Sequence, residues 1–323
     1  MSRFPFLAIA VAACVLAGLS RSQAAEWPAK PVRLVVPSSA GGAADLMGRT
    51  FATAMSGAIG QQFVIDNRPG AGGTIATESV ARAEPDGYTL MVSGLAYHVL
   101  GPAINANATF DPVRDFTHIA YFGGSPIVLV VHPSLGVKTY AELAALAANS
   151  RTGLDYVSPG FGTVGNVVAE YLVSRARLNL RHVPYKGGGT AIIDLLAGHI
   201  KIGSLALSTA LEHIRAGGLI PIAVSTADRL PELPALPTFA ELGYGDMVLT
   251  AWFSLSGPAR LPPAIVERLN RAVNEAMTRP EVRTAMDRDA SLIRPMPSRE
   301  FTAFLQGEVE KWTPIVRTIA TGR

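Results

Sequence analysis

The feature that most constrains this chain is a regular alternation of short apolar runs with longer stretches of helical spacing. The segment Val32–Val36 is typical of a buried strand, and apolar residues then recur at helical spacing over 44–59. The same alternation predicts strands at 63–65, 88–92, 127–131, 154–157, 180–184 and 220–225, with helices at 73–83, 140–148, 164–176 and 189–197. It indicates an α/β fold in which largely parallel sheets carry helices on both faces.

The C-terminal part departs from this alternation. From Pro262 onward the pattern is helical almost throughout, and it predicts helices over 263–278, 280–288 and 298–320. Two of these helices begin with proline, which the first helical turn accepts because the backbone N–H has no partner there. The chain therefore ends in helices rather than in a further strand-helix unit.

The N-terminal residues have the features of a secretory signal peptide, which we assign to residues 1–25. One charge, Arg3, precedes a long run of apolar and small residues, and a short polar stretch follows. The pattern predicts export to the periplasm with cleavage near Ala24 or Ala25. The apolar run is shorter than the roughly 20 residues of a spanning helix, which argues against a membrane anchor. Cys14 lies in a segment that fits a lipid-attachment box, and lipoprotein processing there is the alternative.

Removal of this peptide changes the charge and the cysteine content. The full chain has 28 basic and 25 acidic residues. Arg3, Arg21 and Cys14 all lie in the peptide, so the mature chain has a net charge of about +1 and no cysteine. This balance argues against nucleic-acid binding, because no basic stripe is left to meet phosphates. Disulfides and thiolate catalysis are excluded for the mature chain, and its roughly 300 residues are enough for two ordinary domains.

Two glycine-rich loops connect predicted strands to predicted helices and form the candidate binding site. Neither loop contains Lys or Arg, and each places small or hydroxyl residues at a helix start. Free backbone N–H groups and the helix dipole favour an anion there, at the sheet edge where ligands usually bind. The candidate ligand-binding residues are Ser38, Ser39, Ala40, Gly41, Gly42 and Asp45 in the first loop, and Ser158, Gly160, Phe161, Gly162, Thr163 and Asn166 in the second.

Each loop also has a purely structural interpretation. Glycine fills connecting turns for conformational reasons, and an acidic residue in the position of Asp45 often stabilises a helix start. The sequence leaves these alternatives open.

Part of the second loop has the spacing of a dinucleotide-binding motif, since Gly160, Gly162 and Gly165 form G-x-G-x-x-G between a strand and a helix. Such a site needs an acidic residue about 20 positions further on, but the segment 179–186 has no carboxylate. We therefore predict no nucleotide and no other cofactor. The six histidines lack metal-ligand spacing, and neither a G-x-S-x-G elbow nor a G-K-[ST] phosphate loop is present. The sequence predicts no catalytic residue and no metal ligand.

Short motifs distributed over the mature chain resemble those of one family. The sequence is similar, from about Trp27 to the C-terminus, to the substrate-binding proteins of tripartite tricarboxylate transporters, often called the Bug family. The motifs are, in order, 27–37 (WPAKPVRLVVP), Gly41-Gly42 with Asp45, 67–73 (NRPGAGG), 85–90 (PDGYTL), 111–116 (DPVRDF), 182–187 (HVPYKG), 194–198 (DLLAG), Trp252-Phe253 and 268–270 (RLN). Each motif alone is weak, but their common order is specific.

The resemblance implies a periplasmic protein of the two-lobed, Venus-flytrap kind. One lobe would combine residues 26–125 with 250–323, and the other would span 126–249. Two crossing strands, near 123–124 and 244–245, would join the lobes. The two glycine-rich loops would hold one carboxylate of the ligand from opposite lobes, with ordered water helping. Closure would then present a surface to membrane transporter subunits, and we expect the protein to be a monomer.

The sequence departs from the family pattern on the expected cleft side. The first loop lacks the aromatic residue and second proline that commonly flank Gly41 and Gly42, and Pro159 and Asn166 alter the second loop. Three glycines and a threonine, residues 187–190, stand where the family often has a proline before a helix. These differences leave the ligand open among di- and tricarboxylates, aromatic acids and amino acids.

The function predicted from these features is a non-enzymatic receptor that captures a small carboxylated molecule for a secondary transporter. A sensory receptor that serves a membrane kinase has the same requirements, and an exported enzyme that uses the cleft is a further alternative. Because neither loop is cationic, we expect backbone dipoles rather than ion pairs to hold the carboxylate. Lys186 is the nearest basic residue in the sequence, and we expect it to cap or pack rather than to touch the ligand.

Overall fold

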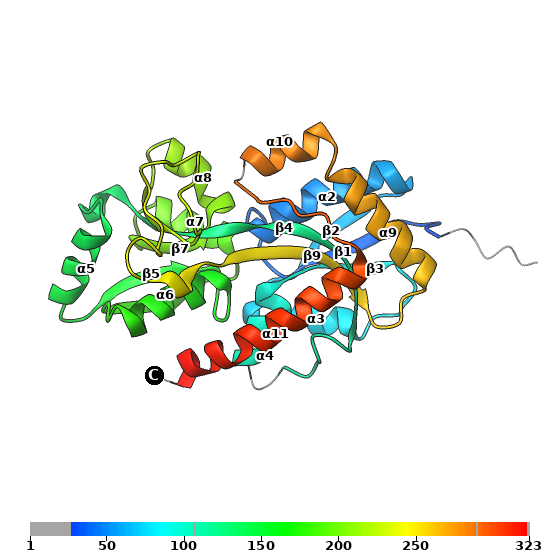
Figure 1. Ribbon diagram of the computed structural model, residues 1–323, viewed down its shortest axis with the longest axis horizontal. Helices are drawn as coiled ribbons and strands as arrows, with labels where there is room; N and C mark the ends of the chain where they lie inside the picture. Colours follow the sequence, from blue (N-terminus) through cyan, green and yellow to red (C-terminus); the bar gives the residue numbers. More distant parts are fainter. Residues whose placement is uncertain (1–26, 106–107, 289, 322–323) are drawn as a thin grey trace, which may run out of the picture.

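This computed structural model describes residues 27–105, 108–288 and 290–321. The predicted signal peptide, residues 1–25, lies outside the described residues, and so does Cys14. No helix in the described ranges is both long and apolar enough to cross a membrane. The predicted α/β organisation is confirmed, because strands and helices alternate over most of the chain and helices occupy its C-terminal part (Figure 1).

The first half of the molecule is built around three parallel strands. β1 (Val32–Val36) lies between β2 (Phe63–Asn67) and β3 (Thr89–Gly94). Every residue of β1 except Arg33 is buried. The helical elements of this half are α2 (Ala43–Ile59), η1 (Ala71–Gly73), α3 (Thr74–Ala81), η2 (Leu95–Leu100), α4 (Gly101–Ile104), α9 (Pro263–Ala276), α10 (Pro280–Arg288) and α11 (Ser298–Thr321). η2 is a π-helix, a form that is frequent at functional sites.

The second half repeats this plan with a different set of strands. β5 (Leu154–Ser158) lies between β6 (Leu180–Pro184) and β7 (Ile202–Ala206), again with all three parallel. The helical elements of this half are η3 (Pro133–Leu135), α5 (Tyr140–Asn149), α6 (Val164–Arg175), α7 (Gly188–Leu196), α8 (Leu207–Arg215) and η4 (Gly245–Met247). Parallel strands send the loops at their carboxyl ends to one edge of the sheet, so each half has one loop-rich edge.

Two long strands join the halves. β4 (Phe116–Val131) and β9 (Thr250–Pro258) pair antiparallel over the whole length of β9. β4 then continues into the second half, where it pairs with β7 and with β8 (Ile220–Val224). Figure 1 shows β4 and β9 side by side through the middle of the molecule. The strand order through both halves is therefore β2-β1-β3-β9-β4-β7-β5-β6.

The predicted elements are all present, with differences in the joining region. The strand predicted at 127–131 is the end of β4, which starts at Phe116. The second crossing strand was expected near 244–245, but it begins at Thr250, and η4 occupies 245–247. Parallel pairing holds for the outer strands of each half, whereas the joining strands pair antiparallel. β7 and α8 were not predicted.

A third segment reinforces the junction between the halves. Leu292, which lies between α10 and α11, exchanges two backbone hydrogen bonds with Gly124, with N···O distances of 2.9 and 2.7 Å. The neighbouring Gly123 has a φ of +128°, and a Cβ there would lie 2.1 Å from the Leu292 carbonyl oxygen. Glycine is required at this point of β4, because a side chain would meet the backbone of the third segment.

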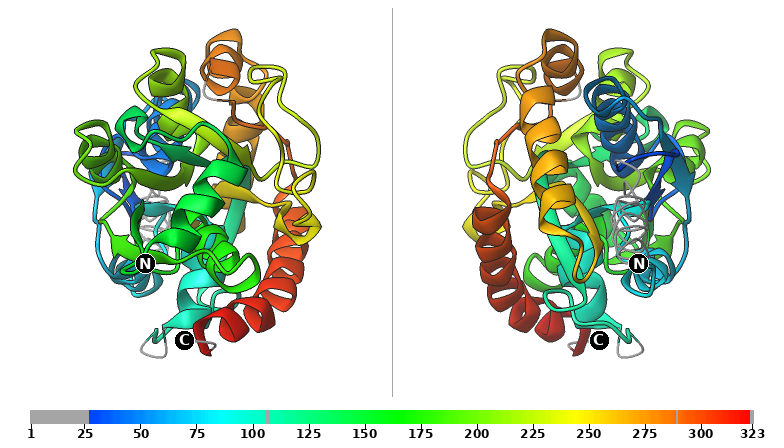
Figure 2. Two further views of the ribbon diagram at one scale, coloured as in Figure 1. Left: turned by 90° about the vertical axis from the view of Figure 1, so that its left-hand side faces the viewer. Right: turned by 90° about the vertical axis from the view of Figure 1, so that its right-hand side faces the viewer.

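Helices that pack against the joining strands hold the two halves in a fixed relative position. Phe51 of α2 stacks on Phe122 of β4 with ring centroids 4.2 Å apart, and both side chains are fully buried. α11 packs against β4 and also reaches α6 of the second half. Figure 2 shows α9, α10 and α11 along one side of the molecule. These contacts place the loop-rich edges of the two halves opposite each other.

Candidate functional site

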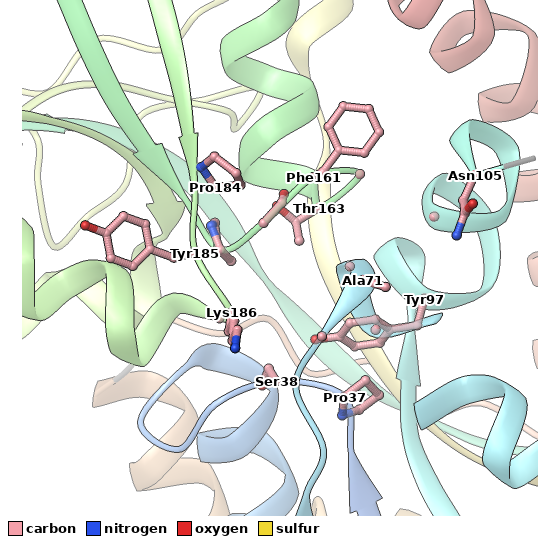
Figure 3. A pocket seen from close by; sticks show the side chains of 18 of the residues that line it. Pro37, Ser38, Ala71, Tyr97, Asn105, Phe161, Thr163, Pro184, Tyr185 and Lys186 are labelled. Atoms are coloured by element: carbon pink, nitrogen blue, oxygen red, sulfur yellow. The ribbon is translucent and has the colours of Figure 1, made fainter. Parts of the chain in front are cut away.

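A cavity of about 630 Å³ lies between the two halves, and we call it the outer chamber. Its walls come from the loops that follow β1, β2, β3, β5 and β6, and Figure 3 shows these loops converging on it. The first half contributes Pro37, Ser38, Gly70, Ala71, Gly72, Gly73, Tyr97, Gly101, Ile104 and Asn105, and the second contributes Pro159, Gly160, Phe161, Gly162, Thr163, Pro184, Tyr185, Lys186 and Gly187.

A second cavity of about 50 Å³, the inner chamber, adjoins the outer one on the side of the joining strands. Ser38 and Tyr97 from the first half and Pro159 and Thr163 from the second line both chambers and form the boundary between them. Among the described residues, no charged side chain lines the inner chamber. Its other wall residues are Ala43, Ala44, Ala96, Ile127, Val164, Gly165, Gly188, Ala206, Thr209, Ala251, Trp252 and Phe253.

Four helices begin at the inner chamber. The wall residues at these helix starts are Ala43 and Ala44 (α2), Val164 and Gly165 (α6), Gly188 (α7), and Ala206 with Thr209 (α8). Backbone N–H groups in the first turn of a helix have no acceptor within the helix, and the helix dipole places about half a positive charge there. The chamber therefore meets four positive helix ends without a cationic side chain, an arrangement suited to a small anion.

The tip of the first loop faces the other half of the molecule rather than the cavity. Ser38 lines both chambers, but residues 39–42 line neither. This tip packs against residues 186–189, and the backbone N–H of Ser39 donates a hydrogen bond of 3.1 Å to the carbonyl oxygen of Lys186. The first loop contributes to the cavity through Ser38 and through the start of α2.

Asp45 is buried behind the first loop. Its carboxylate accepts hydrogen bonds from Gly41 N, Arg49 Nε and Asn67 Nδ2, each 2.9 Å long. Burial raises the pKa of this carboxyl group, but the hydrogen bonds from Arg49, Gly41 and Asn67 outweigh it, so that the pKa lies below its ordinary value. Asp45 lines neither chamber, and its contacts fix the loop and the start of α2, as in the structural alternative that the sequence left open.

The second loop presents side chains as well as backbone to the cavity. Gly160, Phe161, Gly162 and Thr163 all line the outer chamber, and the Phe161 side chain is 45% exposed. Thr163 is the N-cap of α6. Its hydroxyl donates to Gly160 O at 2.8 Å and accepts from Asn166 N at 3.4 Å. This loop is therefore both a wall of the site and a capped helix start.

Ser158 and Asn166 lie behind the second loop and support its shape. Gly160 N donates a 3.1 Å hydrogen bond to Ser158 Oγ, and Gly162 N donates a 3.0 Å hydrogen bond to Asn166 Oδ1. The Asn166 amide also donates to the Tyr156 hydroxyl at 3.0 Å. Neither residue lines a chamber, so both act through the loop that they hold.

Several parts of the wall were not predicted to belong to the site, among them the loop 70–73, Tyr97, the segment 101–105 and the loop 184–187. Tyr97 is buried on η2, and a Cβ at Gly73 would lie 2.4 Å from its ring. Burial raises the pKa of the Tyr97 hydroxyl to about 12, although a hydrogen bond with Ser38 lowers it in part. In Figure 3 this hydroxyl points toward Ser38. The two loops carry the same glycine-rich signal after a strand as the loops that were predicted.

Lys186 is the one charged side chain on the outer-chamber wall within the part of the chain that the structure describes. The structure places it at the cavity, where it is exposed (Figure 3), and our expectation that it caps or packs rather than touches the ligand stays a prediction. No group of three or more His, Cys, Asp or Glu side chains suited to a metal ion occurs among the described residues.

Comparison with known proteins places these features in context. Residues 47–321 match the tripartite tricarboxylate transporter family receptor. The chain is 31% identical over 303 residues to Protein BugT of Bordetella pertussis, which covers 93% of each chain. It superposes on the periplasmic binding protein BugD with a TM-score of 0.87 and 26% identity, covering 91% of this chain and 98% of BugD. It superposes on R. palustris Rpa4515 with adipate with a TM-score of 0.87 and 30% identity, covering 92% and 99%.

These matches confirm the resemblance indicated by the motifs and the predicted two-lobed fold of periplasmic binding proteins. The limits predicted for the lobes, after residues 125 and 249, stay a prediction.

Proposed function

This chain belongs to the tripartite tricarboxylate transporter receptor family, and we propose that it is a periplasmic, non-enzymatic receptor that captures a small carboxylate and delivers it to membrane transporter subunits. In this proposal the two halves of the molecule are the lobes, and the two chambers between them form the ligand site.

The observation that carries the proposal is the convergence of four helix starts on the inner chamber. α2 comes from the first half, and α6, α7 and α8 come from the second. A carboxylate there would accept hydrogen bonds from backbone N–H groups of both halves, and the helix dipoles would favour its charge. A cation would be repelled by the positive partial charge of these groups, and the hydroxyl oxygens of a neutral sugar would accept weaker hydrogen bonds from them than a charged carboxylate does.

The unequal size of the chambers orients the ligand in this proposal. A volume of about 50 Å³ suits a carboxylate group, while about 630 Å³ leaves room for the remainder of the molecule. Phe161 and Ile104 supply apolar surface in the outer chamber, and Lys186 and Asn105 supply polar groups. The relative Rpa4515 was solved with adipate, an acid with a second carboxylate.

The chamber walls also support a binding role without catalysis. The titratable side chains among the residues that line the chambers are those of Tyr97, Tyr185 and Lys186. Burial raises the pKa of both tyrosines to about 12, so neither is a base at neutral pH. Among the described residues, no serine or threonine that lines a chamber is hydrogen-bonded to a histidine as an activated nucleophile would be; Ser158, which contacts His182 at 2.7 Å, lies behind the wall.

A thermal-shift screen tests the proposal. Several charge-assisted hydrogen bonds, each contributing about 1.5–3 kcal/mol, offset by several kcal/mol of ordering cost, predict a dissociation constant on the order of micromolar. At 100-fold excess over that constant, a bound acid stabilises the folded state by about 2.7 kcal/mol. Adipate, succinate, citrate and benzoate are screened beside glucose and putrescine as controls. A clear response to glucose or putrescine, with none to any acid, would disprove carboxylate capture.

A further inference from the structure

We propose that residues 39–42 and 186–189 form a closing contact, here called the glycine clasp, in which Gly189 is a positioning residue that slows the release of bound ligand. The inference rests on the proposed function, because it concerns how the two halves retain a captured carboxylate.

The contact is made by bare backbone on the side of the second half. A Cβ at Gly189 would lie 1.8 Å from the Ala40 carbonyl oxygen, and one at Gly187 would lie 2.5 Å from Ser39 Oγ. Real Cβ atoms essentially never approach another heavy atom within 3.0 Å. The hydrogen bond from Ser39 N to the carbonyl of Lys186 therefore forms only because no side chain separates the two backbone segments.

The first half meets this surface with a glycine of its own. A Cβ at Gly42 would lie 3.2 Å from the Gly188 nitrogen and 3.3 Å from the Gly189 nitrogen. Glycines thus face each other across the contact, and the gap is narrower on the Gly189 side. A single methyl group at Gly189 is enough to hold the two halves apart.

The local structure around Gly189 gives no other reason for a glycine. The residue lies within the first turn of α7 and does not have a positive φ, so alanine fits its backbone conformation. Alanine is also the better helix former. The atoms nearest to a Cβ at Gly189 all belong to the first half, namely Ala40 and Gly42. The need for glycine therefore comes from the contact between the halves.

A second contact on the opposite side of the cavity has the same character but is a poorer place for a test. A Cβ at Gly72 would lie 2.4 Å from the Phe161 carbonyl oxygen. However, Gly72 has a φ of +63°, and Gly187 has a φ of +138°, so a side chain at either position is strained whatever the space. Gly189 is the position where an added methyl group reports on the contact alone.

The clasp also acts on the ligand site. Gly188 lies on the inner-chamber wall at the start of α7, directly beside Gly189. When the clasp is closed, the start of α7 from the second half meets the start of α2 from the first half at one chamber. A ligand that binds one half first does so before the glycine clasp has formed, and it can leave only after the clasp has opened. The contact therefore controls dissociation more than association.

The test compares Gly189→Ala with Gly307→Ala. Gly307 lies within α11, and a Cβ there meets nothing within 4 Å, so both changes add one methyl group to a helix. Rates of association and dissociation are measured for adipate, succinate and benzoate by surface plasmon resonance. X-ray scattering with and without the tightest of the three acids gives the radius of gyration.

We expect Gly189→Ala to release the acid about tenfold faster or more, with association within about twofold of the wild type. The scattering of this variant should keep its ligand-free radius when the acid is added, whereas the wild type and Gly307→Ala contract. Unchanged dissociation and normal contraction in a folded Gly189→Ala protein would overturn the clasp. A wild type that binds none of the acids would instead count against the proposed function.

Gly42→Ala keeps the test decisive if Gly189→Ala fails to fold. Its methyl group would sit at 3.2 Å rather than 1.8 Å from the opposite backbone, so we expect faster dissociation by a smaller factor. Dissociation equal to that of Gly307→Ala would again contradict the clasp.

Discussion

The inner and outer chambers adjoin each other but are lined by different chemical groups. The inner chamber is lined by helix starts and small or apolar side chains, and none of its wall residues is charged. The outer chamber carries the side chains of Phe161, Lys186 and Asn105 on loops. In the proposed function, peptide groups would therefore select the charge of the ligand, whereas loop side chains would select its remaining shape.

This division has a consequence for substitutions. A change that disturbs the inner chamber should weaken every carboxylate to a similar extent, because all of them present the same group there. A change in the outer chamber should alter the ranking of acids with a smaller overall loss.

Gly42→Val should give the largest effect. A Cβ at this position would already lie 3.2 Å from the Gly188 nitrogen, so the larger valine side chain would hold the start of α2 away from the inner chamber. We expect a loss of at least about 100-fold, or about 2.7 kcal/mol, that is equal for all acids. Calorimetry beside circular dichroism measures affinity and folding together. Unchanged affinity in a folded variant would place the site elsewhere.

Thr163→Val should give an intermediate effect on both stability and binding. The substitution keeps the volume but removes the hydroxyl that caps α6 and accepts from Asn166 N. The free energy of unfolding should fall by about 1 kcal/mol, and binding should weaken by about 1–3 kcal/mol. Thr163→Ser is the control that keeps the hydroxyl. Equal urea midpoints and affinities for the two variants would show that the cap does not support the site.

Lys186→Met should give a small effect that depends on the acid. Lys186 is exposed on the outer-chamber wall, and exposed ion pairs contribute about 0–1 kcal/mol. We expect Lys186→Met to weaken the binding of a dicarboxylate by at most about fivefold and to leave the binding of benzoate unchanged. The affinity for both acids should depend only weakly on salt, since buried interactions are screened little. Titrations at low and high salt check this. A tenfold loss on adding salt that Lys186→Met abolishes would show a direct ion pair in place of capture by backbone dipoles.

The dependence of affinity on pH should be the smallest effect. Burial raises the pKa of Tyr97 to about 12, so this side chain on the chamber wall stays neutral as the pH rises. Behind it, burial and the nearby His118 hold the pKa of His98 well below its ordinary value, so no positive charge appears there as the pH falls. Affinity for adipate should therefore be flat between about pH 6 and pH 9. A tenfold change within that range would reveal a titrating group in the site.

Much of this organisation could be predicted from the sequence. The alternation that starts at Val32 gave the order of strands and helices, because side-chain periodicity is a local property. The two loops at 37–45 and 158–166 were identified because small residues after a strand and before a helix are also a local signal. Their lack of Lys and Arg indicated capture by backbone dipoles.

The role of each residue within those loops was harder to predict from the sequence. Ser38 and Thr163 line the chambers, while Asp45 and Asn166 hold loops from behind. Residues of each kind look alike in a sequence, because both are polar residues beside glycines. Tyr97 was missed because it lies on a π-helix that periodicity does not distinguish from an ordinary helical turn.

The α/β class, the family and the two loops beside the cleft could be predicted from the sequence, since each of these follows from residues close together in the chain. The folded chain was needed to show that four helix starts share one small chamber, that Lys186 lies on the wall of the larger one, and that residues 39–42 lie against 186–189. The segments 39–42 and 186–189 are more than 140 residues apart in the sequence (186 − 42 = 144), and the joining strands β4 and β9 fix the relative position of the two halves. Local patterns carry no information about such distances, so the contacts appear only when the chain is folded.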